Sequence, residues 1–171
     1  LNILHYIGTV VSGTGVDTFV LHLANAQRRL GIDSFIGCDG SDREEFLATA
    51  RASGYPYFTF PVLDKIAPLL PQFVHTVLTI LLRTAMLIFF MLRNRIDVLH
   101  VHAVALSSLE AHLASAITRI PIVVTHHATI EYIRPFWTKQ NDWVLRFERW
   151  RTKLVVCPYR RAADELLELG M

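Results

Sequence analysis

Four histidines lie in or at the ends of two consecutive apolar segments of the chain, and their imidazole rings can do chemistry near neutral pH. His100 and His102 lie in one segment, and His126 and His127 end the next. Each ring can donate a hydrogen bond to a hydroxyl or a phosphate. His100 and His102 share one face of a strand, whereas the adjacent His126 and His127 point to different sides or lie in a turn. We take His102 and His127, at the segment ends, as the strongest candidates for ligand contact, with His126 beside them.

A metal site is the second chemistry that these rings could support. Zinc takes three or four ligands in a tetrahedral shell, and the histidines fill that shell only if Cys38 or a carboxylate joins them. A histidine inside an apolar strand is more often a hydrogen-bonded core residue, which is our prediction for His5 and His100. We expect neither a metal nor a cofactor in this chain.

A glycine-containing segment, residues 8–17, precedes the first expected helix. Backbone amides at a helix N-terminus can receive a phosphate, which makes this segment a candidate for binding an anion or a sugar. The candidate residues are Gly13, Thr14, Gly15 and Val16. The spacing is not that of the dinucleotide fingerprint, because Thr18 stands where the third glycine belongs. That these glycines only shape a turn is the alternative.

A second candidate segment, residues 131–137, combines aromatic and charged side chains after the fifth expected strand. Such segments stack on sugars, grip lipids or simply pack. Its Arg134 is a candidate for contact with a phosphate, and a solvated surface arginine is the alternative.

Alternating apolar runs and helical patterns predict the elements that position these residues. Strands are expected at residues 2–7, 33–37, 57–60, 97–102, 121–125 and 153–156. Helices are expected at residues 16–30, 43–52, 71–93, 106–118, 142–151 and 159–169. This alternation predicts an α/β fold with a doubly wound, mostly parallel, Rossmann-like sheet of about six strands in three α/β/α layers. Ligands of such sheets bind outside the carboxyl ends of the strands, where His102 and His127 are expected.

The composition fits one domain, residues 1–171, with a well-covered core. The hydrophobic fraction of 52% favours a sheet buried on both faces. The net charge is only +2 and the charges are spread along the chain, so we expect no nucleic-acid partner. Cys38 and Cys157 match no paired-ligand spacing, which favours a reducing, cytoplasmic location. We expect no signal peptide, and we expect a domain boundary after Gly170.

An apolar stretch, residues 73–92, is long enough to span a bilayer. Spanning would separate the first strands of the sheet from the last ones, so we expect a crossover helix. Its first turns set a polar ridge opposite Leu78, Leu81 and Leu82, as a helix packed on a sheet would. Its last turns, residues 85–92, are apolar all round and are candidates for peripheral contact with the inner face of the membrane. Burial by another domain or by a partner subunit is the alternative.

Several of these segments together resemble a known family. They are the opening strand with its glycine turn, the helix end at residues 23–31, the aspartate-led strand 97–102, the strand 120–127 that ends in Thr-x-His, and the closing helix 163–170. Over nearly its whole length the chain resembles the N-terminal domain of family-4 retaining glycosyltransferases, whose fold pairs two facing Rossmann-like domains.

The resemblance implies a reaction and a site. His127 corresponds to the family's active-site histidine, which approaches the transferred sugar, and residues 13–16 would lie against the donor phosphates or the acceptor. The implied reaction moves a sugar from a nucleotide-sugar donor to a glycan or lipid-linked acceptor, with retained configuration and no metal, as in the synthesis of a surface polysaccharide. The chain departs from the family pattern at Thr14, Asp17 and Pro158, where a glycine, a glutamate or glutamine, and a serine are usual.

The family's acidic pair, phosphate-binding basic residues and nucleoside pocket belong to a C-terminal donor-binding domain that this chain lacks. We therefore expect residues 1–171 to bind mainly the acceptor and to be inactive alone. Two alternatives stay open at this point: a membrane-associated binding subunit of a split glycosyltransferase, and a nucleotide-binding oxidoreductase or epimerase.

Overall fold

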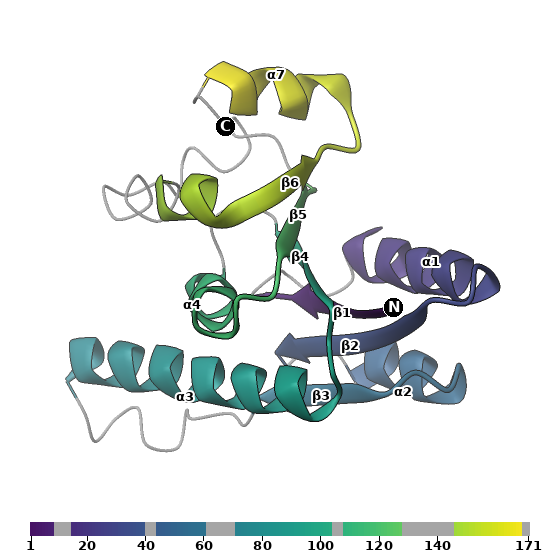
Figure 1. Ribbon diagram of the computed structural model, residues 1–171, viewed down its shortest axis with the longest axis horizontal. Coiled ribbons are helices and arrows are strands. Elements are labelled where there is room, and N and C mark those ends of the chain that lie inside the picture. The colour runs from purple at the N-terminus through teal and green to yellow at the C-terminus, as the bar shows by residue number, and fades with distance from the viewer. Residues whose placement is uncertain (9–14, 40–43, 61–70, 104–107, 128–145, 169–171) are drawn as a thin grey trace.

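The computed structural model describes residues 1–8, 15–39, 44–60, 71–103, 108–127 and 146–168 (Figure 1). The strands are β1 (Asn2–Ile7), β2 (Asp33–Asp39), β3 (Tyr57–Phe60), β4 (Val98–Ala103), β5 (Ile122–His126) and β6 (Thr152–Val156). The helices are α1 (Gly15–Arg29), α2 (Glu44–Ala52), α3 (Gln72–Arg93), α4 (Leu109–Thr118) and α7 (Arg160–Glu168), and residues 146–151 are helical as well. The predicted strands 2–7 and 57–60 are confirmed to the residue, and the other strand ends differ by one or two positions.

The strands form one six-stranded sheet in the order β3-β2-β1-β4-β5-β6, and every pair is parallel. The strand order reverses between β1 and β4, which is the switch point of a doubly wound sheet. The predicted fold class is therefore confirmed. At the switch point Ile7 pairs with His102, and one strand further Ala103 pairs with His126. The carboxyl ends of β1, β4 and β5 thus meet at one edge of the sheet.

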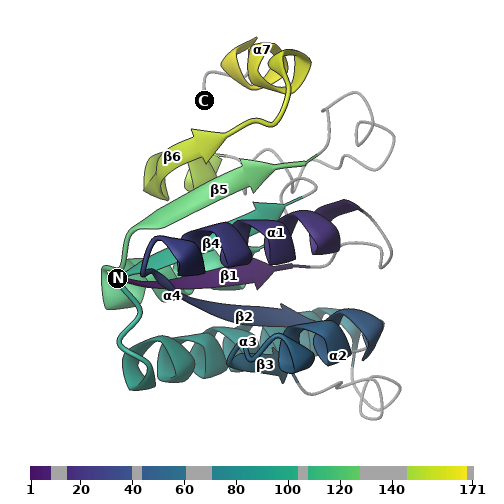
Figure 2. The ribbon, with the colours of Figure 1, turned by 90° about the vertical axis from the view of Figure 1, so that its right-hand side faces the viewer.

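Helices cover both faces of this sheet, with α1 and α2 on one side and α3 and α4 on the other (Figure 2). Alternation along β1 sends Leu4 and Tyr6 into the core beneath α3 and α4, whereas Ile7 enters the core beneath α1 and α2. A fully buried aliphatic side chain contributes on the order of 1.5–3 kcal/mol by leaving water. Two such cores hold the sheet from both faces, as the high hydrophobic fraction predicted.

The end of α1 is fixed by Gly31, which adopts a φ of +74° that other residues rarely tolerate. The N–H of Gly31 donates to the carbonyl of Arg28, and the N–H of Ile32 donates to the carbonyl of Gln27. These two bonds close the last turn in the manner of a glycine C-cap. Gln27 is therefore held at the helix end that lies over the sheet.

The turns of helix α3 that pack on the core are not the ones that were predicted to do so. In the last turns, residues 85–92, where some apolar side chains were expected to be exposed, Leu87 and Met91 are fully buried, whereas Phe89 and Leu92 are 66% and 61% exposed. Leu78, Leu81 and Leu82, expected to pack on the sheet, are instead 44%, 58% and 39% exposed. The expectation was wrong because only the last turns of α3 pack on the core that contains Leu4 and Leu99. The apolar surface of α3 therefore lies mainly in its first three turns.

Candidate functional site

Strand alternation brings four histidines to the face of the sheet that α1 covers. His5 pairs with His100 across β1 and β4, and their neighbours Leu4, Tyr6 and Leu99 enter the opposite core. His102 lies two residues beyond His100 on the same face, beside Thr125 of β5. His127 follows β5 directly, two residues after Thr125. Sequence reasoning expected His100 and His102 to share a face, which is confirmed, but it did not bring His5 into the same group.

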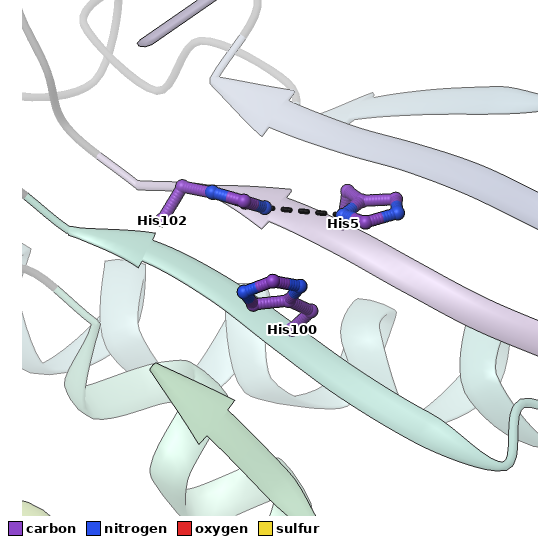
Figure 3. Close-up of side chains that lie close together, drawn as sticks. All are labelled: His5, His100 and His102. Atoms are coloured by element: carbon purple, nitrogen blue, oxygen red, sulfur yellow. Dashed lines mark hydrogen bonds between the residues drawn. The ribbon is translucent and has the colours of Figure 1, made fainter. Parts of the chain in front are cut away.

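Three of these rings and a glutamine form a continuous hydrogen-bonded row. The Nε2 atom of His5 lies 2.7 Å from Oε1 of Gln27, and the Nδ1 atom of His5 lies 3.1 Å from Nε2 of His102. Nδ1 of His102 lies 3.2 Å from Nε2 of His127. Figure 3 shows the bond between His5 and His102, with the ring of His100 beside it. His100 is not a link in the row, because its Nε2 atom bonds instead to the Thr125 hydroxyl at 2.7 Å.

Burial keeps these rings neutral. His5 and His102 are fully buried, and the loss of water around them lowers the pKa of His5 to about 4 and that of His102 well below its usual value. Burial and the nearby rings of His5 and His127 lower the pKa of His100 to about 3. At neutral pH each imidazole therefore carries one ring proton and one lone pair.

His127 is the member of the group that reaches the edge of the sheet. Its side chain is half-buried. Burial is the main cause that lowers its pKa to about 4, and the neighbouring His126 is the second cause. Phe19 of α1 packs edge-on against the ring at a centroid distance of 5.0 Å. The hydroxyl of Tyr159 donates to the backbone carbonyl of His127. His102 and Phe19 thus hold the ring, Tyr159 holds the backbone, and the residue offers a neutral imidazole to the edge where a ligand is expected.

His126 points away from this group. Its Nε2 atom lies 3.2 Å from Oε1 of Glu148, and both side chains are buried. The pair is at ion-pair distance without the geometry of a hydrogen bond. His126 and His127 therefore serve different faces of the sheet, as their adjacency predicted. Ligand contact by His126 stays a prediction.

The remaining predicted site residues are placed only in part. Gly15 is exposed at the first position of α1, and the side chain of Val16 is buried in the core beneath that helix. Any contact between Val16 and a ligand would therefore use its backbone amide. Gly13, Thr14 and Arg134 lie outside the described residues, so their predicted contacts with donor or acceptor remain predictions.

The arrangement of His5, His100 and His102 also bears on metal binding. One ligand atom of each lies within 4.8 Å of the others, a spacing that could suit a transition-metal ion. However, Nδ1 of His5 and Nε2 of His102 already bond to each other, and within this group no carboxylate offsets the charge that a divalent cation would bring into a buried site. The hydrogen bonds are a sufficient reason for this geometry.

Sequence reasoning missed Gln27 and Phe19. A signal for Gln27 was present, because the buried stripe of α1 runs through Val16, Val20 and Ala24, and a polar residue continues it at position 27. A polar side chain on such a stripe needs a buried partner, and His5 with Ser34 provides it. Phe19 left no comparable signal, since one aromatic residue on a helix is ordinary.

Comparisons with known proteins place this geometry in context. The model of Glycosyltransferase Family 4 matches residues 13–171. A glycosyltransferase structure from Rickettsia africae is 18% identical with a TM-score of 0.66, over 98% of this chain and 39% of its own. The UDP-GlcNAc 2-epimerase of Neisseria meningitidis, bound to UDP-GlcNAc, is 14% identical with a TM-score of 0.69, over 100% and 43% of the two chains. The lipopolysaccharide outer core galactosyltransferase WaaB is 10% identical with a TM-score of 0.67, over 100% and 43%.

No curated protein sequence matches the chain significantly. At the identities of the solved structures the likeness shows the fold alone. The chain spans about two-fifths of the length of each of these three structures.

Proposed function

The chain belongs to glycosyltransferase family 4 and forms one Rossmann-like half of the two-domain fold of these transferases, and from that premise we propose that it is the acceptor-side half. In the complete enzyme a sugar passes from a nucleotide-sugar donor to a glycan or lipid-linked acceptor at the carboxyl edge of β1, β4 and β5. The anomeric configuration of the sugar is retained. A partner domain, C-terminal to residues 1–171, binds the donor nucleotide.

The observation that carries this proposal is the position of His127. It follows β5 at the edge where doubly wound sheets bind their ligands, and three neighbours hold its ring and backbone. A ring held in one orientation can meet a sugar hydroxyl without a further loss of side-chain freedom. Catalysis in this proposal comes from positioning and from stabilisation of the leaving diphosphate by the donor domain.

The donor assignment draws support from relatives rather than from the chain itself. The Neisseria meningitidis epimerase of the same fold is described with UDP-GlcNAc bound, and WaaB is described as a galactosyltransferase of the lipopolysaccharide outer core. For this chain, the first name favours a nucleotide sugar as the donor, and the second favours an acceptor linked to a lipid or a glycan. A cytoplasmic site of action is part of the proposal.

Epimerisation of a nucleotide sugar is the second candidate function, because the match to the epimerase covers the whole of this chain. The family match over residues 13–171 favours transfer. The two functions differ in their products, since an epimerase returns an altered free nucleotide sugar or sugar, whereas a transferase joins the sugar to an acceptor.

Peripheral contact with a membrane is part of the proposal. Helix α3 is the one helix, among the residues described, that is long and apolar enough to cross a bilayer, with a mean hydropathy of 1.9 over its most apolar window. Its exposed apolar residues include Phe73, Leu81 and Phe89, at 77%, 58% and 66% exposure. The exposed basic residues Arg93 and Arg95 follow at its end. Apolar side chains with flanking arginines favour a helix that lies in the interface of an anionic membrane, close to a lipid-linked acceptor.

The test is a transfer assay with the full-length protein that carries this chain, a panel of nucleotide sugars and crude membrane lipid as acceptor. Transfer of labelled sugar to the lipid or glycan fraction, with the donor's anomeric configuration kept in the product, supports the proposal. A product of inverted configuration contradicts the retaining mechanism. An epimerised sugar without transfer would favour the second candidate function instead.

A further inference from the structure

The row formed by Gln27, His5, His102 and His127 runs from the end of α1 to the carboxyl edge of the sheet, and we call it the histidine row. Its three bonds measure 2.7, 3.1 and 3.2 Å. The two inner histidines have no exposed surface. Both ring nitrogens of His5 and of His102 have a partner within the row, so the row is continuous from one end to the other.

The direction of every hydrogen bond in the row follows from Gln27, the residue at one end of it. Oε1 of Gln27 is a carbonyl oxygen, which can only accept, and it also accepts the hydroxyl of Ser34 at 2.9 Å. The hydrogen of the bond between Gln27 and His5 must therefore come from Nε2 of His5.

The same constraint fixes the donor in each of the other two bonds of the row. A neutral imidazole has one ring proton, so Nδ1 of His5 must accept and Nε2 of His102 must donate to it. Nδ1 of His102 then accepts, and the donor to it is Nε2 of His127. All three histidines carry their proton on Nε2.

We propose that Gln27, His5 and His102 are positioning residues that fix the tautomer of His127, leaving its Nδ1 atom as a hydrogen-bond acceptor. This inference rests on the proposed function, in which His127 meets the transferred sugar. An accepting nitrogen recognises a group that donates, which a sugar hydroxyl does and an ionised phosphate does not. The row therefore assigns His127 to a hydroxyl and leaves the phosphates to other residues.

His100 supplies the matched control inside the same cluster. Its ring lies 5.3 Å from that of His5 and 4.3 Å from that of His102, centroid to centroid. It shares their face of the sheet, yet its Nε2 atom bonds to Thr125 rather than to the row. Replacement of His100 disturbs the packing around the row and leaves every bond of the row in place.

The experiment reads the tautomers directly, by heteronuclear NMR of the imidazole nitrogens of this chain at about pH 7.5, where all three rings are neutral. In the unsubstituted chain and in His100→Phe, we expect a proton on Nε2 of His5, His102 and His127. In Gln27→Leu the row loses its fixed end, and in His102→Phe the ring of His127 loses its acceptor. In both variants His127 should become a mixture of its two tautomers.

A rescue variant separates positioning from folding. Gln27→Glu keeps an oxygen that can accept, so it should restore the Nε2 tautomer along the whole row, including at His127. If His102→Phe fails to fold, Gln27→Leu and Gln27→Glu still decide the matter, because residue 27 is only partly buried at a helix end.

A proton on Nδ1 of His127 in the unsubstituted chain would overturn the inference, and so would a His127 tautomer that Gln27→Leu leaves unchanged. Titration with zinc chloride is the third arm. Slow-exchange shifts of the His5, His100 and His102 signals at one equivalent of zinc would show that these residues form a metal site, and would also overturn the inference. Unchanged spectra would support the inference. These readouts need no turnover, so failure of the sugar-transfer proposal would leave the result on the row standing by itself.

Discussion

Acidification should weaken this fold more than any single surface substitution. The pKa of His5 is about 4 and that of His100 about 3 in the folded chain, against 6.5 for an ordinary histidine. Below pH 6.5 these histidines therefore bind protons in the unfolded chain, whereas in the folded chain they stay neutral until the pH is much lower. The free energy of unfolding is at its full value above that pH and falls as the pH drops toward 4.

The magnitude follows from the size of the shifts. Each ring whose pKa lies well below the working pH takes up about one proton on unfolding, which costs about 1.4 kcal/mol for every pH unit below 6.5. Between about pH 7.5 and pH 5.5, His5 and His100 together lower the free energy of unfolding by roughly 3 kcal/mol. His102, whose pKa is also lowered, acts in the same direction. Domains are typically stable by about 5–15 kcal/mol, so this is a large share.

Urea denaturation followed by tryptophan fluorescence at several pH values measures this loss. His100→Phe should be less pH-sensitive than the unsubstituted chain by about 1.4 kcal/mol over this range, because one titrating ring is gone. Leu154→Ser changes an exposed side chain that does not titrate and should leave the slope as it is. Equal free energies of unfolding at both ends of the pH range would show that the folded chain does not hold these histidines neutral, and so would a slope that His100→Phe does not reduce.

Three further predictions concern the surface and the core. The double substitution Phe73→Ser with Leu81→Ser should reduce co-sedimentation with phosphatidylglycerol vesicles by about tenfold. The control Leu154→Ser changes a side chain of β6 that is 57% exposed and should not reduce it. Equal loss in both variants would contradict membrane contact by α3. Gly37→Ala should destabilise the chain by about 1–3 kcal/mol, because the new Cβ would lie 2.3 Å from Cε1 of Phe58, whose ring stacks on Phe90; thermal melting that finds no loss would show that Phe58 moves aside. Glu148→Ala should cost about 1–3 kcal/mol, because it removes the buried carboxylate that lies at ion-pair distance from His126. Urea midpoints equal to those of the unsubstituted chain would argue against that contact.

The sheet was predictable because each strand is a short apolar run bounded by polar or turn residues. The sequence at residues 2–7 alternates core side chains with His5, and the structure reproduces that alternation on both faces. The parallel order followed from the crossover helices between strands. Local pattern and global fold agree at these positions, so reading the pattern was sufficient.

The histidine row could not be predicted in the same way, because it depends on registry between strands. His5 and His102 are far apart in the sequence, and only the pairing of Ile7 with His102 brings their rings together. A histidine in an apolar strand was expected to be a bonded core residue, and His5 is one. Its partner, however, is decided by the tertiary structure.

Helix α3 was misjudged for a related reason. The hydrophobic pattern shows which side chains of a helix share a face, and it does not show how far along its length the sheet extends. The core reaches Leu87 and Met91 but not Leu78 or Leu81. The exposed first turns are a property of the packing, which the helix sequence alone does not encode.

The role of His127 in sugar transfer is tested by comparing kcat/KM of the full-length protein with that of its His127→Ala variant. The donor is the nucleotide sugar that the panel identifies, and His22→Ala is the matched control on an exposed surface. Loss of a group that positions the transferred sugar predicts a fall on the order of 100-fold in His127→Ala, with the control within about twofold. Transfer by His127→Ala at the unsubstituted rate would contradict the claim and remove His127 from the site.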